Sequence, residues 1–190
     1  MKPGLIAILF CLCSLQGAAQ DKAANAIGQA PTGDLTPIAA LDVPRYMGTW
    51  HEIAKFPNRF QKKCVGHTQA DYSLMTDGRV KVINRCKLES GEFNEAIGAA
   101  RQVGAPSSAK LKVRFAPAWL SFIPAVWGDY WVIDLDDNYQ LAAVSEPGRE
   151  FLWILSRTPQ IDQKSYESLL NRLREKGFDL QKLEITRQGS

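Results

Sequence analysis

Apolar and polar residues alternate in short segments through most of the chain between residues 50 and 157. Leu111, Val113 and Phe115, for example, alternate with Lys112 and Arg114. A period of two residues is typical of a strand with one buried face and one solvated face. The pattern predicts strands over residues 50–56, 65–74, 79–86, 93–103, 110–115, 130–135, 139–145 and 151–157.

Turn signals separate these segments, among them Asp77-Gly78, Asp137-Asn138 and Pro147-Gly148. Asp-Gly tolerates the positive φ that tight hairpins require. Closing a sheet into a barrel removes its exposed edges. Eight short strands joined by turns therefore predict an all-β fold, an eight-stranded antiparallel up-and-down β-barrel.

One helix is expected after the last of these strands, because apolar residues recur there with helical spacing. Asp162 is the predicted N-cap and Gly177 the predicted C-terminal stop. The apolar stripe predicts that this C-terminal helix packs on the outside of the barrel, followed by a last strand over residues 183–186. The stripe consists of Tyr166, Leu169, Leu170 and Leu173.

The first 19 residues have the features of a secretory signal peptide: Lys2, an apolar run over residues 5–15, and Gly17-Ala18-Ala19 before the expected cleavage. Neither Cys11 nor Cys13 follows the small residues that lipid attachment requires, so a soluble exported protein is expected. Residues 20–40 lack a sustained period and are predicted to form a flexible leader. The folded domain is expected over residues 41–190.

Composition narrows the function classes. A formal charge of +3, evenly scattered, is too small for an electrostatic nucleic-acid binder. His51 and His67 are the only histidines and lack the spacing of metal ligands. Phosphate-binding and nucleophile motifs are absent from the sequence. We therefore expect no catalytic residue, no metal and no other cofactor.

Trp50 and Arg157 are the most informative pair. Alternation places Trp50 on one face with Ala54 and Phe56, and Arg157 on an apolar face with Trp153. A guanidinium stacks well on an indole, for about 1 kcal/mol or more when shielded from water. The alternative is an ordinary amphipathic strand that ends in a surface arginine.

Three blocks carry a resemblance to a known family: Gly48-Thr49-Trp50, the run from Tyr130 to Asp136, and the run from Leu152 to Pro159. Together they resemble the lipocalin family, most closely its bacterial outer-membrane members and the animal protein apolipoprotein D, over about residues 41–187. The resemblance implies a barrel that carries a hydrophobic ligand, with Gly48, Trp50 and Arg157 as a structural plug at the closed end.

Consecutive strands of an up-and-down barrel run in opposite directions, so the start of the first strand and the end of the eighth lie at the same end of the barrel. The opposite end is therefore the mouth. Between the two ends, inward residues would form an apolar and aromatic wall that leaves room for one ligand or is filled by its own side chains. The resemblance implies a ligand, a fatty acid or lysophospholipid with its polar head at the mouth. The predicted ligand-contacting residues are Tyr72, Ala96, Ala100, Val113, Phe115, Tyr130, Val132 and Trp153.

Cys64 and Cys86 remain after export, at the open ends of two predicted paired strands. In an oxidising compartment they are expected to form a disulfide. Simple pairing does not place them opposite each other, so a bulge or a loop shift is needed. The alternative is a free nucleophilic Cys64 in a lipocalin-type enzyme.

Two further features remain open. Residues 117–127 are too apolar for an ordinary loop: they fold inward as a cap, or Trp119, Phe122 and Ile123 make transient contact with a membrane surface. Glu52 would point inward with Trp50, so it meets a cation or its strand is irregular.

The sequence therefore predicts a non-catalytic protein that binds, transports or stores small hydrophobic lipids in the cell envelope. The expected location is the periplasm or outer-membrane periphery of a Gram-negative-type cell, or the secreted fraction. The alternative is an enzyme that acts on a bound lipophile through Cys64.

Overall fold

The structure is a computed structural model that describes residues 33–189. The predicted signal peptide, Cys11, Cys13 and the leader up to residue 32 lie outside the described residues. No helix in the described part of the chain is long and apolar enough to cross a membrane.

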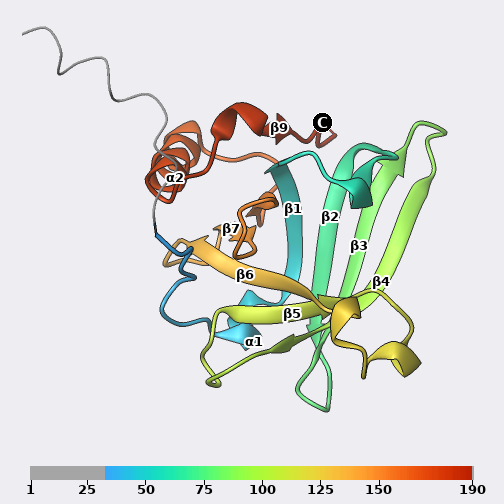
Figure 1. Cartoon of the computed structure of the whole chain (residues 1–190). Helices are drawn as coiled ribbons and strands as arrows, with labels where there is room; N and C mark the ends of the chain where they lie inside the picture. Colours follow the sequence, from blue (N-terminus) through green and yellow to red (C-terminus); the bar gives the residue numbers. More distant parts are fainter. Residues whose placement is uncertain (1–32, 190) are drawn as a thin grey trace, which may run out of the picture. The chain divides into compact units, whose positions relative to one another are not determined.

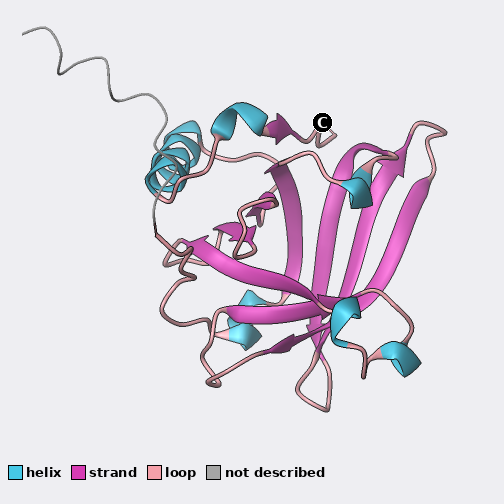
Figure 2. Ribbon diagram, in the orientation of Figure 1, coloured by secondary structure: helices cyan, strands magenta, loops and turns pink. Residues whose placement is uncertain are grey.

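The strands form one antiparallel sheet that closes on itself (Figures 1 and 2). The ring is closed by β1, which pairs with β2 through residues 48–51 and with β8 through residues 51–55. The predicted eight-stranded up-and-down barrel is confirmed. Its strands are β1 (Gly48–Lys55), β2 (Cys64–Leu74), β3 (Val80–Leu88), β4 (Phe93–Gln102), β5 (Lys110–Arg114), β6 (Gly128–Leu135), β7 (Leu141–Ser145) and β8 (Leu152–Ser156).

Short elements close the two ends of the barrel. The helix α1 (Val43–Tyr46) precedes β1 at the closed end, and β9 (Glu184–Ile185) pairs with the far half of β1, where β2 has diverged. At the mouth, a 3-10 turn over Arg59–Gln61 follows β1, and two more, Ala118–Leu120 and Pro124–Val126, lie between β5 and β6. A fourth covers Leu180–Lys182.

The C-terminal helix α2 (Gln163–Glu175) has the predicted ends. The Asp162 carboxylate accepts a hydrogen bond of 2.8 Å from the Ser165 amide, and Gly177 has a φ of +85°. Leu169 and Leu173 are fully buried, in a cluster with Ile133 and other outward residues of the barrel. The helix therefore packs outside the barrel, as predicted.

Two cores result from this arrangement. The first fills the closed end inside the barrel, around Trp50, Val132 and Val144. The second lies between the outer face of β6, β7, β8 and β1 and the helix α2. The inner core thus closes one end of the barrel, and the empty space extends from there to the mouth.

A bulge in β1 corrects the predicted face of this strand. Glu52 pairs with Leu155, but Ala54 pairs with Ile154, so the register shifts between them. Trp50 belongs to the inner core, whereas Ala54 and Phe56 belong to the outer one. The prediction that these three residues share a face is wrong, because the extra residue reverses the alternation.

The end of the predicted flexible leader is packed against the barrel. Leu35 is 4% exposed in the outer core, and the Ile38 amide donates to the Val132 carbonyl at 2.9 Å. Arg149 donates to the Gly33 carbonyl at 2.9 Å. Residues 33–40 therefore belong to the packed domain, which starts before the predicted boundary at Leu41.

Candidate functional site: an internal cavity

The closed end of the barrel is sealed by Trp50 and Arg157. Trp50 is fully buried, and the guanidinium carbon of Arg157 lies 4.0 Å from the centre of its indole ring. Arg157 also donates to the backbone carbonyls of Thr49 and Arg45, at 3.0 and 3.1 Å. Burial lowers the pKa of Arg157, and the three contacts offset that cost by binding the charge. The expected stacking is present.

Gly48 is required beside this arginine. Its φ is +96°, and a Cβ there would lie 3.2 Å from an Arg157 Nη1 atom. Any larger residue would be strained in backbone and would crowd the guanidinium.

The aspartates at the end of β6 have two separate roles. Asp134 is nearly buried, and its carboxylate accepts hydrogen bonds of 2.8 and 2.9 Å from Arg172 of α2. Asp136 accepts hydrogen bonds from the backbone amides of Asn138, Gln140 and Leu141, which builds the turn into β7. The first fixes the helix on the barrel, and the second shapes the closed end.

A cavity of about 620 Å³ lies inside the barrel. It extends from Tyr46 of α1 to the mouth loops that hold Phe60 and Trp127. This volume is typical of sites that enclose one small molecule. Most of the predicted wall does line it: Tyr72, Ala96, Ala100, Val113, Phe115, Tyr130 and Trp153.

Val132 is the exception among the predicted ligand-contacting residues. It points inward but is fully buried in the core of the closed end and does not line the cavity. Alternation gives the face of a strand residue but not its depth along the barrel. Gly98, also inward, lets Phe115 approach β4, since a Cβ there would lie 2.7 Å from the Phe115 ring.

Three tyrosine hydroxyls meet at the floor of the cavity. The Tyr130 hydroxyl lies 3.0 Å from that of Tyr46 and 3.1 Å from that of Tyr72. Burial raises the pKa of Tyr72 to about 12 and those of Tyr46 and Tyr130 well above their usual range. All three are neutral hydrogen-bonding groups at physiological pH. Sequence reasoning missed Tyr46, which lies in α1, outside the predicted strands.

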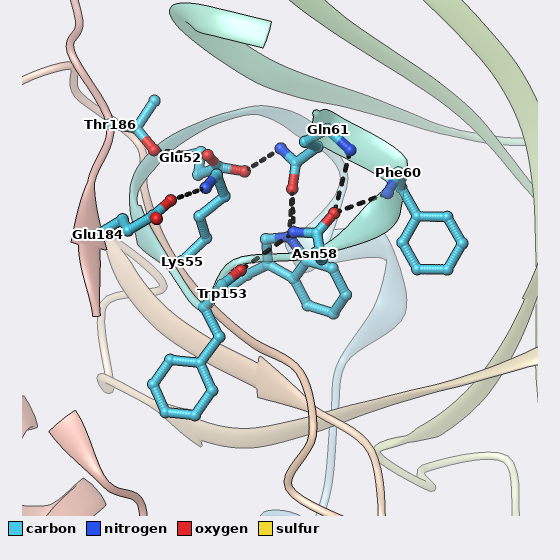
Figure 3. A network of polar contacts seen from close by, with 9 residues as sticks. Glu52, Lys55, Asn58, Phe60, Gln61, Trp153, Glu184 and Thr186 are labelled. Carbon is cyan, nitrogen blue, oxygen red and sulfur yellow. Dashed lines mark hydrogen bonds and ion pairs between the residues drawn. The ribbon is translucent and has the colours of Figure 1, made fainter. Parts of the chain in front are cut away.

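A second polar group faces the cavity near the mouth (Figure 3). The buried carboxylate of Glu52 accepts hydrogen bonds of 2.5 Å from Gln61 Nε2 and from the Thr186 hydroxyl. The Gln61 side-chain oxygen in turn accepts from the indole of Trp153 at 3.0 Å and from Asn58 at 2.7 Å. Glu52 thus joins the mouth turn to β8 and to the C-terminal segment.

The state of Glu52 follows from these contacts. Burial raises its pKa, and the hydrogen bonds from Thr186 and Gln61 partly oppose that rise. Of the two explanations drawn from the sequence, the irregular strand is confirmed by the bulge. Its direct side-chain partners are two neutral donors rather than a cation.

Comparison with known proteins agrees with this geometry. The model of the lipocalin-like domain matches residues 41–188. The chain belongs to the lipocalin family. It is 44% identical over 153 residues to temperature-induced lipocalin-1 of Arabidopsis thaliana, covering 80% of this chain and 81% of that protein.

Two other relatives support the assignment. Outer membrane lipoprotein Blc of Escherichia coli K12 is 40% identical, over 80% of this chain and 82% of its own length. Apolipoprotein D of Mus musculus is 33% identical, over 79% and 78%. Insecticyanin of the tobacco hornworm Manduca sexta shares the fold, with a TM-score of 0.64, 22% identity, and coverage of 86% and 88%.

Cys64 and Cys86 of this lipocalin form a disulfide, with their Cα atoms 5.5 Å apart. Cys64 pairs with Leu88 in the sheet, and two register shifts, around Gly66, move the strands relative to each other. The disulfide and the irregularity that it needs are thus both confirmed. In this state Cys64 has no free thiol, so the nucleophile that the enzyme alternative requires is absent. Lipocalin relatives are generally binding proteins rather than enzymes.

The apolar loop between β5 and β6 was expected either to fold inward as a cap or to expose its side chains to a membrane. One part of the loop is exposed, and the other part folds inward. Trp119 and Phe122 are 70% and 76% exposed, while Ile123 is partly buried. Trp127 turns inward, lines the cavity, and donates from its indole to the Ser121 carbonyl at 2.8 Å. Only the second part of the loop is a cap.

Within residues 33–189, no group of three or more His, Cys, Asp or Glu side chains is arranged to hold a metal ion. The polar groups that line the cavity include hydroxyls, side-chain amides, the buried carboxyl of Glu52 and, toward the mouth, the charged side chains of Arg59, Asp129 and Glu146, all of which can form hydrogen bonds to an organic ligand.

Proposed function

We propose that this lipocalin binds small hydrophobic lipids, fatty acids or lysophospholipids, and transports or stores them without catalysis in the cell envelope. Lipocalins generally bind small hydrophobic ligands. The observation that carries the proposal is the cavity of about 620 Å³, whose wall is aromatic and aliphatic around small residues such as Ala96 and Ala100. Burial of each CH₂ group there contributes roughly 0.8 kcal/mol.

Mass spectrometry of lipid extracted from protein purified from its native compartment tests this proposal. The expected result is one acyl lipid in near-stoichiometric amount. Ala96→Phe, which adds a large side chain to the cavity wall, should lose that lipid, whereas the outward substitution Ile97→Ala on the same strand should keep it. Extracts without lipid from the native protein would contradict the proposal.

The proposed location is the periplasm or outer-membrane periphery of a Gram-negative-type cell, or the secreted fraction. A disulfide suits an oxidising compartment. The names of two relatives, an outer membrane lipoprotein and an apolipoprotein, agree with export. Fractionation of cells that express the full chain tests this, and a cytoplasmic protein with two free thiols would contradict it.

The proposed route of the ligand runs through the mouth while Trp119 and Phe122 touch a membrane surface. Both side chains are exposed beside the cavity entrance, and an indole is favoured at the water–hydrocarbon boundary. Phe60, on the facing loop, is also 63% exposed. Ile123 is partly buried and is expected to contribute less.

Transfer of a fluorescent fatty acid from vesicles tests this route. Trp119→Ser with Phe122→Ser should slow transfer severalfold and leave the affinity in solution nearly unchanged, because neither side chain lines the cavity. Leu74→Ser, an exposed apolar residue at the end of β2 nearest the closed end, is the matched control. Equal transfer rates for all three proteins would refute the contact.

A further inference from the structure

The hydroxyls of Tyr46, Tyr72 and Tyr130 have one hydrogen more than their mutual contacts use. Three hydroxyls carry three hydrogens, and the two oxygen–oxygen contacts, of 3.0 and 3.1 Å, use two of them. No other hydrogen bond to these three hydroxyls is found in the part of the chain that the structure describes. One donor is therefore available at the floor of the cavity, which all three residues line.

Tyr130 is the residue best placed to offer that donor. Its oxygen lies between the other two and can accept from both, which leaves its own hydrogen for a third partner. Tyr46 and Tyr72 are buried, while Tyr130 is only partly buried. A hydroxyl that accepts two hydrogen bonds is polarised and donates more strongly.

The surroundings of the cluster favour an electron-rich partner. The Tyr46 ring lies 4.8 Å from that of Trp50, and the guanidinium carbon of Arg157 lies 4.0 Å from the centre of the same Trp50 ring. Among the charged groups near Tyr72, Arg157 lowers the pKa of this tyrosine, and this effect is larger than the opposite effects of Asp71 and Glu52. Asp71 is paired with Arg85. A cation thus lies beneath the floor, and oxygen acceptors above it are stabilised.

Near the mouth, aromatic rings line the cavity and can contact a hydrocarbon chain. Phe151 stacks on Trp153 at 5.8 Å between ring centres, and Phe60 lies 5.6 Å from Phe151. All three residues line the cavity. The charged side chains of Arg59, Asp129 and Glu146 also line the cavity on this side, so the entrance combines aromatic rings with charges, whereas the floor offers a neutral hydrogen-bond donor.

We propose that the Tyr46, Tyr72 and Tyr130 hydroxyls bind the carboxyl or carbonyl oxygen of a fatty-acid-like ligand, whose chain extends toward the mouth. This inference rests on the proposed lipid-binding function and reverses the orientation expected from the sequence. It also predicts that a fatty acid and a lysophospholipid bind in opposite orientations. A lysophospholipid carries a large charged head that the floor cannot solvate, so its head stays at the mouth.

Affinities of tyrosine variants test the anchor. In Tyr130→Phe, and further in Tyr72→Phe with Tyr130→Phe, binding of a saturated fatty acid should weaken on the order of tenfold. Binding of the lysophospholipid with the same acyl chain should change less than twofold. Tyr139→Phe is the matched control, because its hydroxyl accepts from the Asp42 amide at the closed end and does not line the cavity.

Two results would overturn the anchor: unchanged fatty-acid affinity in both variants, or an equal loss for both ligands. If wild-type protein bound neither lipid, the proposed function itself would fail, so the two failures are distinguishable. Near-wild-type unfolding midpoints for the variants would confirm that the cavity is intact.

Fatty acids brominated at either end report the orientation directly, since bromine quenches nearby tryptophan. Trp153 lies at the mouth and Trp50 below the floor. Because Trp127 also lines the cavity at the mouth, the comparison uses the variant with both Trp127→Phe and Trp153→Phe. Bromine at the chain end should quench wild-type protein much more than this variant, whereas bromine beside the carboxyl should quench both to a similar degree. The reverse pattern would place the head at the mouth and overturn the inference.

Discussion

At the scale of single residues, the closed end depends on a charge held by an aromatic ring. Arg157 stacks on Trp50 and donates to three backbone carbonyls, those of Thr49, Arg45 and Tyr139. Truncating Trp50 leaves a large cavity and a poorly satisfied charge, and truncating Arg157 leaves three carbonyls without this donor. Both defects destabilise a folded protein by a few kcal/mol.

Trp50→Ala and Arg157→Ala should each lower the free energy of unfolding by about 3 kcal/mol. Urea unfolding at neutral pH measures this. Lys110→Ala is the matched control, because its ammonium lies 4.4 Å from the Trp131 ring on the outside of the barrel. It should change stability by about 1 kcal/mol or less. Wild-type midpoints for the two plug variants would sink this account of the closed end.

Glu52 should make stability depend on pH. Burial raises its folded-state pKa above the ordinary value of 4.5. At pH values between 4.5 and the raised pKa, the folded protein therefore binds more protons than the unfolded one. The contribution of this group is therefore fully present below pH 4.5 and is lost as pH rises through the raised pKa. Glu52→Gln should lack this decline in urea titrations across the interval. Parallel curves for the two proteins would show that Glu52 does not titrate differently in the folded state.

Residue positions were predictable from the sequence where chemistry restricts them. An arginine on an apolar face and an indole far from it in sequence predicted the stack of Arg157 on Trp50. Val132 shows the limit, since alternation gives its inward direction but not its depth. Tyr46 and Gln61 gave no periodic signal, because they lie outside the strands.

At the scale of elements, irregularities in the strands position the site. The bulge in β1 follows Glu52, which keeps the inward direction of Trp50, and sends Ala54 to the outer core. The shifts around Gly66 in β2 bring Cys64 to Cys86. Regular alternation predicts strands and turns well, but a single inserted residue reverses the face and has no signature in periodicity.

The disulfide should stabilise the mouth by about 3 kcal/mol in the chain-entropy model, given a sequence separation of 22 residues. Cys64→Ser with Cys86→Ser should lower the unfolding free energy by that amount. Reduction of the wild-type protein should produce a similar loss and leave the double variant unaffected. If non-reducing peptide mapping of freshly exported protein showed two free thiols, the enzyme alternative would become testable again.

At the scale of the whole molecule, the fold follows from edge closure and from one helix. The eight strands, the cap at Asp162 and the stop at Gly177 were all predictable, because each has a local signal. The sequence could not predict whether side chains fill the interior of the barrel, because this depends on the joint volume of side chains from every strand. Residues 33–40 were also missed, because single apolar residues such as Leu35 carry no period.

The central claim is that the empty interior of this lipocalin holds an acyl chain, and a homologous series of fatty acids tests it most directly. Titration by quenching of tryptophan fluorescence should show affinity rising by roughly 0.8 kcal/mol per added CH₂ until the chain fills the cavity of about 620 Å³. Beyond that length the affinity should level off. A response that is flat from the shortest chain onward would mean that the cavity does not accept the hydrocarbon.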